Sequence, residues 1–373
     1  MKISLLANSK SPNPGNWALI AGTKALIEET FGANVEFDII SWDDITFTDS
    51  LFRKDFFQRV NISDLFWVVG AVTFNGRDEH VRGGCRLNLS GTDLAQIKTP
   101  MVLGGVSYRY WSDNIYPRKE ELTQLLNNLT SKDSCLIGLR NDGTKKWLAE
   151  LTSIESQNIM EFPDPGMFAM RTPKGINVGR SGLIFSLNNE DSDSRFSAAE
   201  ERENLIQAMA LACLSFWENY DEYVSFAPHS FEDYELFSEL ITLLPKRLLH
   251  QRVSVLPIPP AHESKKFYEY YSNARAVIAT RVHSMSPSIG MGIPTLIISS
   301  QDRLINYTNK IGIRRYVIEQ SKIGKRDGVI AEELIRVLNS CSSVYEEFTR
   351  VRQEQRDAAS LLLDRVKKML HAT

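Results

Sequence analysis

The stretch ARAVIATRVHSMSPSIGMGIPTLIIS, residues 274–299, holds two short apolar runs separated by a segment of small residues. The first run, 275–281, ends in an arginine, and the second, 294–300, begins at a proline. Apolar runs of this length that are bounded by turn residues are typical of buried strands, and the small residues between them suit a helix. The stretch therefore predicts a strand, a helix and a second strand of one parallel sheet.

The same alternation of strand-like and helix-like segments extends over most of the chain. Further apolar runs lie at 2–8, 34–40, 64–72, 99–107, 134–140, 158–165, 223–230 and 252–260. A break rich in glycine and basic residues, near 170–180, separates two such series. We predict an α/β protein of two doubly wound, Rossmann-like domains that face a cleft, as in GT-B glycosyltransferases. The expected domains are 1–172 and 173–345, with a terminal helix, 346–373, packing across or near their boundary.

Composition excludes several classes of function. With 43 Lys and Arg against 46 Asp and Glu, the net charge of −3 argues against a dedicated nucleic-acid binder. The four cysteines form no CxxC pair, and no histidine has metal-ligand spacing, so we expect a reduced protein without a metal. We find no signal-peptide core and no apolar run of membrane-spanning length, which predicts a cytoplasmic protein. A peripheral contact with the inner face of the membrane is left open.

Candidate site residues follow the predicted strands, because ligands of such sheets gather beyond the carboxyl ends of the strands. Arg140, Arg281, His283 and Arg303 all stand at such positions. A lone histidine near a strand end more often packs than reacts. Here, however, Arg281 adds a fixed charge and His283 a group that titrates near neutral pH. The helix that follows would offer free N–H groups, expected at 284–287, to an anion.

Other residues leave two interpretations open. Asn16 suits a ligand contact as well as a helix cap. Arg140 could bind a ligand or fix the next loop through Asp142. Among the arginines of residues 75–86, Arg82 is preferred for the site by its distance from the predicted strand. Asp164, between two prolines, is expected to form a turn. His229 is open to a role as a second site residue, although a loop histidine more often packs.

Residues 271–299 resemble the C-terminal signature of the polysaccharide pyruvyl transferase family, in which a strand ends in Arg-x-His before a small-residue helix and a G-x-P strand. NSKSPNPGNWALIAG (8–22) resembles the family's N-terminal loop, and CLIGLRNDGTKKWLAEL (135–151) its strand–Arg–Asp–helix element. Three further segments resemble family elements and follow in the family's order: FPDPGM (162–167), APHSFEDYELFSEL (227–240) and SSQDRLINYTNKIGI (299–313). The resemblance covers residues 3 to 315. The sequence departs from the pattern in its short GAV at 70–72, an extra residue before Asp142, and an arginine at 303 where many members have lysine.

The resemblance implies transfer of the pyruvyl group of phosphoenolpyruvate to two hydroxyls of a sugar in a surface polysaccharide or glycan, with formation of a ketal and release of phosphate. It implies His283 and Arg140 as catalytic residues and a donor site that contains Arg281, Arg303, Ser284, Arg82 and Asn16. Phosphoenolpyruvate is a co-substrate, and neither a cofactor nor a metal is expected. We expect Arg140, Arg281, His283 and Arg303 to converge on one pocket.

Two other functions are consistent with the sequence. One is a nucleotide-sugar-dependent glycosyltransferase with the same two-domain architecture. The other is a non-catalytic subunit of a glycan-assembly complex, which the departures from the family pattern would suit. The acceptor sugar, a lipid carrier for it and a homo-oligomeric state are left open.

Overall fold

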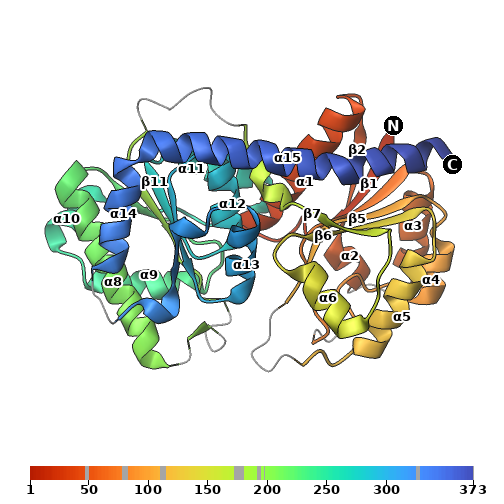
Figure 1. Ribbon diagram of the computed structural model, residues 1–373, viewed down its shortest axis with the longest axis horizontal. Coiled ribbons are helices and arrows are strands. Elements are labelled where there is room, and N and C mark those ends of the chain that lie inside the picture. The colour runs from red at the N-terminus through yellow and green to blue at the C-terminus, as the bar shows by residue number, and fades with distance from the viewer. Residues whose placement is uncertain are drawn as a thin grey trace. The chain divides into compact units, whose positions relative to one another are not determined.

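The computed structural model describes residues 1–46, 50–77, 83–109, 115–171, 180–190, 195–196, 198–324 and 328–372. By its internal contacts the chain divides into two compact units. The first contains Met1–Ser11, Leu19–Pro165 and Glu354–Thr373, and the second contains Pro12–Ala18 and Gly166–Gln353. The boundary that the sequence predicts, between 172 and 173, lies outside the described residues. Each unit has a sheet of its own, and Figure 1 labels the helices and some of the strands.

The sheet of the first unit has the order β2-β1-β3-β5-β6-β7, with β4 paired to β5, and its pairings are parallel. Its strands are β1 (Lys2–Ala7), β2 (Glu36–Ser41), β3 (Leu65–Val69), β4 (Val72–Phe74), β5 (Met101–Tyr108), β6 (Cys135–Arg140) and β7 (Ile159–Phe162). β3, β5 and β6 are buried along their whole length, as strands covered on both faces must be. The helices are α1 (Pro14–Phe31), α2 (Trp42–Thr46), α3 (Ser50–Asn61), α4 (Gly91–Gln96), α5 (Lys119–Thr130) and α6 (Thr144–Thr152).

The sheet of the second unit has the order β10-β9-β8-β11-β12-β13, which is the doubly wound order of dinucleotide-binding folds. Its strands are β8 (Leu183–Ser186), β9 (Val224–Phe226), β10 (Val253–Val255), β11 (Ala276–Ala279), β12 (Thr295–Ser299) and β13 (Val317–Glu319). The helices are α8 (Ala199–Tyr220), α9 (Asp233–Thr242), α10 (Lys246–Arg252), α11 (Ser264–Asn273), α12 (Val282–Gly290), α13 (Asp302–Lys310) and α14 (Val329–Asn339). The two doubly wound parallel sheets confirm the predicted fold class.

Residues 274–299 form the predicted unit of strand, helix and strand. β11 pairs with β12 in parallel, with Val277 opposite Thr295, and α12 connects them. Gly292, at φ 67°, ends α12 in a left-handed turn. There the N–H of Gly292 bonds Ile289 and the N–H of Ile293 bonds Ser288, each at 2.9 Å, which satisfies two helix-end carbonyls. The unit is therefore defined by its own local hydrogen bonds as well as by the sheet.

The last helix, α15 (Cys341–Ala372), begins at Cys341 rather than at the predicted 346. Its residues through Gln353 belong to the second unit, and those from Glu354 onward belong to the first. In the part of the chain that is described, no helix is both long enough and apolar enough to span a bilayer.

Candidate functional site

The second unit has its topological switch point between β8 and β11, where the strand order changes direction. The chain that leaves β8 there carries Asn189 and Glu190, and the chain that leaves β11 carries Arg281 and His283. In open α/β sheets the crevice beyond this point is the usual ligand site. Arg281 and His283 thus lie at the switch point, where ligands of such folds usually bind.

Arg281 is the residue before α12 and is only 8% exposed. Its Nη2 donates to Asp233 Oδ1 at 2.5 Å and to Ser230 Oγ at 3.2 Å. Its Nη1 lies 3.1 Å from Glu190 Oε2. The guanidinium therefore lies among side chains that follow β8 and β9, which are remote from it in sequence.

Asp233, the first residue of α9, is fully buried. Besides Arg281 it accepts the main-chain N–H groups of Asn189 at 3.0 Å, His229 at 2.8 Å and Ser230 at 3.0 Å. A buried carboxylate is stable only with an opposite charge and hydrogen bonds, and Asp233 has both. One carboxylate thus connects the loops after β8 and β9 to the start of α12. The sequence pattern includes Asp233 in a segment that resembles the family, but it does not indicate this role.

His283 is the second residue of α12 and is half-buried. Its main-chain carbonyl accepts a hydrogen bond from the Tyr268 hydroxyl at 2.8 Å. The Tyr268 ring is stacked on Trp17, with 5.7 Å between ring centroids and 24° between planes. His283 and the first residues of α1 therefore share a neighbour in α11.

Gly15 lies directly against the imidazole of His283. A Cβ at position 15 would be 2.7 Å from His283 Nδ1 and 2.8 Å from its Cβ, closer than real contacts of this kind. The cap of this helix is Asn13, whose Oδ1 accepts the N–H of Gly15 at 2.9 Å. Asn16 is therefore not the cap, which corrects one of its two interpretations. It lies beside Gly15 in the same first turn and in the same unit as His283, and its contact with a ligand stays a prediction.

The start of α12 differs in detail from the expectation. Because the helix begins at Val282 and the N–H of Met285 already bonds Arg281 at 3.1 Å, the first-turn N–H groups are those of 282–284 and not 284–287. Ser284 is fully buried, and its Oγ donates to the carbonyl of Arg281 at 3.0 Å. In this structure its hydroxyl therefore holds the turn, and a contact with the donor stays a prediction.

Arg303 lies in the first turn of α13, directly after β12, and is half-buried. Because β12 is the parallel neighbour of β11, Arg303 and Arg281 both follow the carboxyl edge of one sheet. Arg82 lies outside the described residues. Among the residues described, no group of three or more His, Cys, Asp or Glu side chains could hold a metal ion.

Arg140 belongs to the first unit, where it is the last residue of β6 and only 1% exposed. Its Nε lies 3.1 Å from Asp164 Oδ2, and Asp164 is fully buried. Asp142 instead accepts hydrogen bonds from Ser107 Oγ at 2.7 Å and Thr144 Oγ1 at 2.5 Å. The interpretation that Arg140 fixes its loop through Asp142 is thereby corrected, and Asp164 is a buried counter-ion rather than only a turn residue. A catalytic role for Arg140, and its convergence with Arg281, stay predictions.

His229 packs against aromatic side chains of α11, and a role in the site stays untested. It is 1% exposed, its Nε2 lies 3.2 Å from the Tyr271 hydroxyl, and its ring meets Phe267 edge-on at 5.2 Å. Burial lowers its pKa well below the ordinary range, and the nearby charges of Arg281 and His283 lower it further. His229 is therefore neutral near neutral pH.

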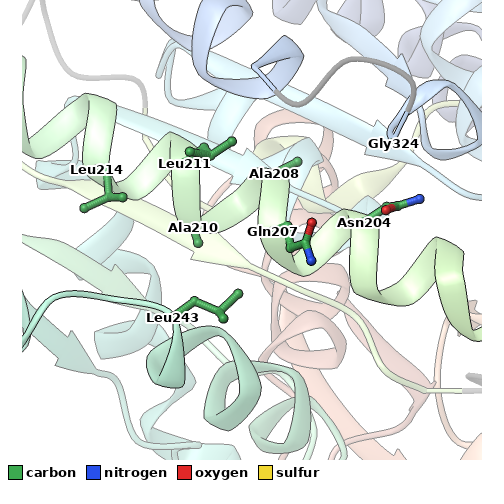
Figure 2. A pocket seen from close by; sticks show the side chains of 8 residues that line it. All are labelled: Asn204, Gln207, Ala208, Ala210, Leu211, Leu214, Leu243 and Gly324. Carbon is green, nitrogen blue, oxygen red and sulfur yellow. The ribbon is translucent and has the colours of Figure 1, made fainter.

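A separate hollow of the second unit lies along α8 (Figure 2). It is lined by Asn204, Gln207, Ala208, Ala210, Leu211, Leu214, Leu243 and Gly324. None of these residues is charged and none belongs to the cluster around Arg281. This hollow therefore offers a ligand no charged side chain, whereas Arg281 lies at the switch point.

Several solved structures share the fold of this chain. A candidate UDP-N-acetylglucosamine 2-epimerase of Listeria monocytogenes is similar with a TM-score of 0.60 and 13% identity, over 100% of this chain and 97% of that one. The E. coli ADP-heptose lipopolysaccharide heptosyltransferase II has a TM-score of 0.53 and 11% identity, over 91% and 99%. The UDP-GlcNAc 2-epimerase of Neisseria meningitidis has a TM-score of 0.53 and 11% identity, over 98% of this chain and 100% of that one. At these identities the likeness shows the fold alone, which is that of GT-B glycosyltransferases and epimerases.

The family model described as polysaccharide pyruvyl transferase matches residues 13–302, well over half of the chain. The chain belongs to this family, which is a family of transferases. No curated protein matches the sequence. The matched range contains Asn16, Arg140, Arg281 and His283 and ends one residue before Arg303.

Proposed function

We propose that this protein transfers the pyruvyl group of phosphoenolpyruvate to two hydroxyls of a sugar in a polysaccharide or glycan, with phosphoenolpyruvate as co-substrate. The observation that carries the proposal is the position of Arg281 and His283 at the switch point of the second unit, inside the range that matches the family. A phosphate monoester and a carboxylate on one small donor require cations, and arginine suits both groups.

The reaction balances without an oxidant or a reductant. The methylene carbon of the donor gains a proton and becomes a methyl group, while the adjacent carbon forms bonds to two sugar oxygens. The bond from that carbon to the phosphate oxygen breaks. Of the two hydroxyl protons, one replaces the proton added to carbon and the other leaves with the phosphate, which departs as the hydrogen phosphate dianion.

The second unit supplies groups for each requirement. His283 is half-buried at the start of α12 and can deliver the proton to carbon as a general acid. The first-turn N–H groups of residues 282–284 and the positive end of the helix dipole favour an anion. Arg281 and Arg303 follow neighbouring strands and supply positive charge. In this proposal the arginines hold the donor and His283 performs the proton transfer.

The test is incubation with phosphoenolpyruvate and a panel of galactose-, glucose- and mannosamine-type acceptors, with phosphate release and ketal formation as readouts. His283→Gln keeps a hydrogen-bonding group but cannot act as an acid near neutral pH. We expect its turnover to fall by about 10²–10⁴-fold with donor affinity little changed. Arg303→Ala should weaken donor binding by about 10–100-fold, and Arg303→Lys should be milder because a point charge is retained.

Two results would contradict the proposal. Near-normal turnover of His283→Gln would remove this histidine from the chemistry. Failure of phosphoenolpyruvate to bind, together with binding of a nucleotide sugar, would instead identify a nucleotide-sugar-dependent glycosyltransferase. Binding is measured by calorimetry on the same preparations, so an unsuitable acceptor panel is distinguished from an absent donor site.

A further inference from the structure

Two carboxylates contact the guanidinium of Arg281, and they differ in burial. Asp233 is fully buried and is fixed by three main-chain N–H groups in addition to Nη2 of Arg281. The Glu190 side chain is 41% exposed, and its Oε2 lies 3.1 Å from Nη1. Within the described part of the chain, Glu190 thus covers the edge of the guanidinium that Asp233 leaves available.

The main chain of Glu190 is anchored although its carboxylate is accessible. The N–H of Glu190 bonds Asn188 Oδ1 at 3.0 Å, and its carbonyl accepts from Arg195 Nε at 2.6 Å. Arg195 in turn reaches Ser300, after β12, with 3.2 Å between its Nη1 and Oγ. The side chain can therefore turn into solvent without displacement of the loop that carries it.

We propose that Glu190 is a displaceable counter-ion, which occupies the Nη1 edge of Arg281 until an anionic group of the donor replaces it. This inference rests on the proposed function, because it assigns the donor anion to Arg281. Only the Glu190 side chain is partly exposed, so water can stabilise its carboxylate once it leaves, while the buried guanidinium keeps the charge of Asp233 beside it. Displacement of Asp233 would instead leave a buried carboxylate without its cation. The incoming anion therefore replaces Glu190 and leaves Asp233 in place.

The arrangement makes Glu190 a competitor of every anion that binds at Arg281. An anion binds at Arg281 only when its contacts outweigh those of the carboxylate already present. A donor with both a phosphate and a carboxylate can engage the guanidinium and the start of α12 together, whereas a small anion engages only one of them. Removal of the carboxylate of Glu190 should thus strengthen the binding of every anion that contacts Arg281, and by a similar factor.

The experiment is calorimetric titration of the full chain with phosphoenolpyruvate and, separately, with inorganic phosphate. We compare the wild type with Glu190→Gln, with Asp233→Asn, and with Glu218→Gln. Glu218 is exposed on α8, so the last variant makes the same change of charge away from Arg281. Glu190→Gln should tighten binding of inorganic phosphate and of phosphoenolpyruvate by a similar factor of about two to five, the range expected for an ion pair whose carboxylate is partly exposed. Glu218→Gln should leave both affinities unchanged, and Asp233→Asn should weaken both.

Unchanged or weaker anion binding in Glu190→Gln would overturn the inference, and so would an equal gain in Glu218→Gln. Absence of anion binding in every variant would overturn it as well.

These outcomes can be distinguished from failure of the proposed function. If the protein turns over phosphoenolpyruvate but Glu190→Gln binds neither anion more tightly, only the counter-ion role fails. If Glu190→Gln binds inorganic phosphate more tightly than the wild type but phosphoenolpyruvate is never consumed, the counter-ion role stands and the proposed reaction fails. Thermal unfolding of each variant shows that it is folded, and the conclusion does not depend on Asp233→Asn.

Discussion

The hydroxyl of Tyr268 donates a hydrogen bond to the main-chain carbonyl of His283, with 2.8 Å between the two oxygens. Pro287 lies four residues after His283 in α12, and proline has no N–H with which to bond that carbonyl. Tyr268 is fully buried in α11, so its hydroxyl replaces the missing helical donor. The turn that carries His283 is thus held by a neighbouring helix.

Tyr268→Phe should destabilise the protein by about 0.5–1.5 kcal/mol, because it removes a part-buried hydrogen bond to the His283 carbonyl. Pro287→Ala restores an N–H at the position where a regular helix would bond His283. We therefore expect Tyr268→Phe to cost less in a Pro287→Ala background, and urea unfolding of the four proteins measures the difference. Equal costs in both backgrounds would show that the phenol does not substitute for the helical bond.

Gly15→Ala should act on His283 specifically. The added methyl group would lie 2.7 Å from Nδ1, so the imidazole must move. Displacement of a catalytic group by about 1 Å can cost about 10²-fold in rate, and we expect a fall of up to that size in kcat with little change in KM for the donor.

Gly328→Ala is the matched control for Gly15→Ala. A Cβ at position 328 would meet only the flexible side chain of Glu332, at 3.3 Å, and should leave activity unchanged. A raised KM with normal kcat in Gly15→Ala would contradict a role in orienting His283.

His229 should make the protein sensitive to mild acid. Its folded pKa lies well below the ordinary value of 6.5, so below about pH 6.5 the unfolded chain binds a proton that the folded chain does not. As the pH is lowered through this window, the free energy of unfolding should decrease by up to about 1.4 kcal/mol per pH unit. Replacement of His229 by Gln removes this contribution, and urea unfolding of both proteins from about pH 7 to about pH 5 measures it. Identical pH slopes would indicate that the folded protein accepts the proton.

The four cysteines should react unequally with a thiol reagent. Burial raises the pKa of Cys85 and Cys135 to about 12 and also raises that of Cys213, whereas Cys341 is exposed at the start of α15. Only the thiolate reacts, so we expect one fast thiol in the native protein and four after denaturation. Cys341→Ser should abolish the fast reaction, and a second fast thiol in the native wild type would contradict the packing described.

The sequence predicted the strands well because a buried parallel strand is an uninterrupted apolar run. The run 134–140 corresponds to β6, and 274–299 to β11, α12 and β12. The order of the strands could not be predicted, since it depends on pairings between distant segments, such as β11 with β8. The ends of strands were also overestimated: the predicted strand 252–260 contains only Val253–Val255.

The candidate site was predicted only in part. Arg281 and His283 were found because they follow a strand directly. Their partners Asp233, Glu190 and Tyr268 come from other segments, and sequence spacing does not reveal such contacts. One local signal was missed. Pro14 suits the first position of a helix, which would have identified Asn13 rather than Asn16 as the cap.

The terminal helix has a consequence for how this protein is made. Within the first unit, Asn141 Nδ2 donates to Gln355 Oε1 at 2.8 Å across 214 positions of sequence. Leu362 also lies against Gly138, so close that a Cβ there would be 2.7 Å from it. During translation β6 leaves the ribosome long before these partners exist, although domains generally fold as they emerge. The helix that covers this part of β6 is therefore made more than 200 residues after the strand, and a nascent chain must keep that face of β6 from aggregating until Gln355 and Leu362 have been synthesised.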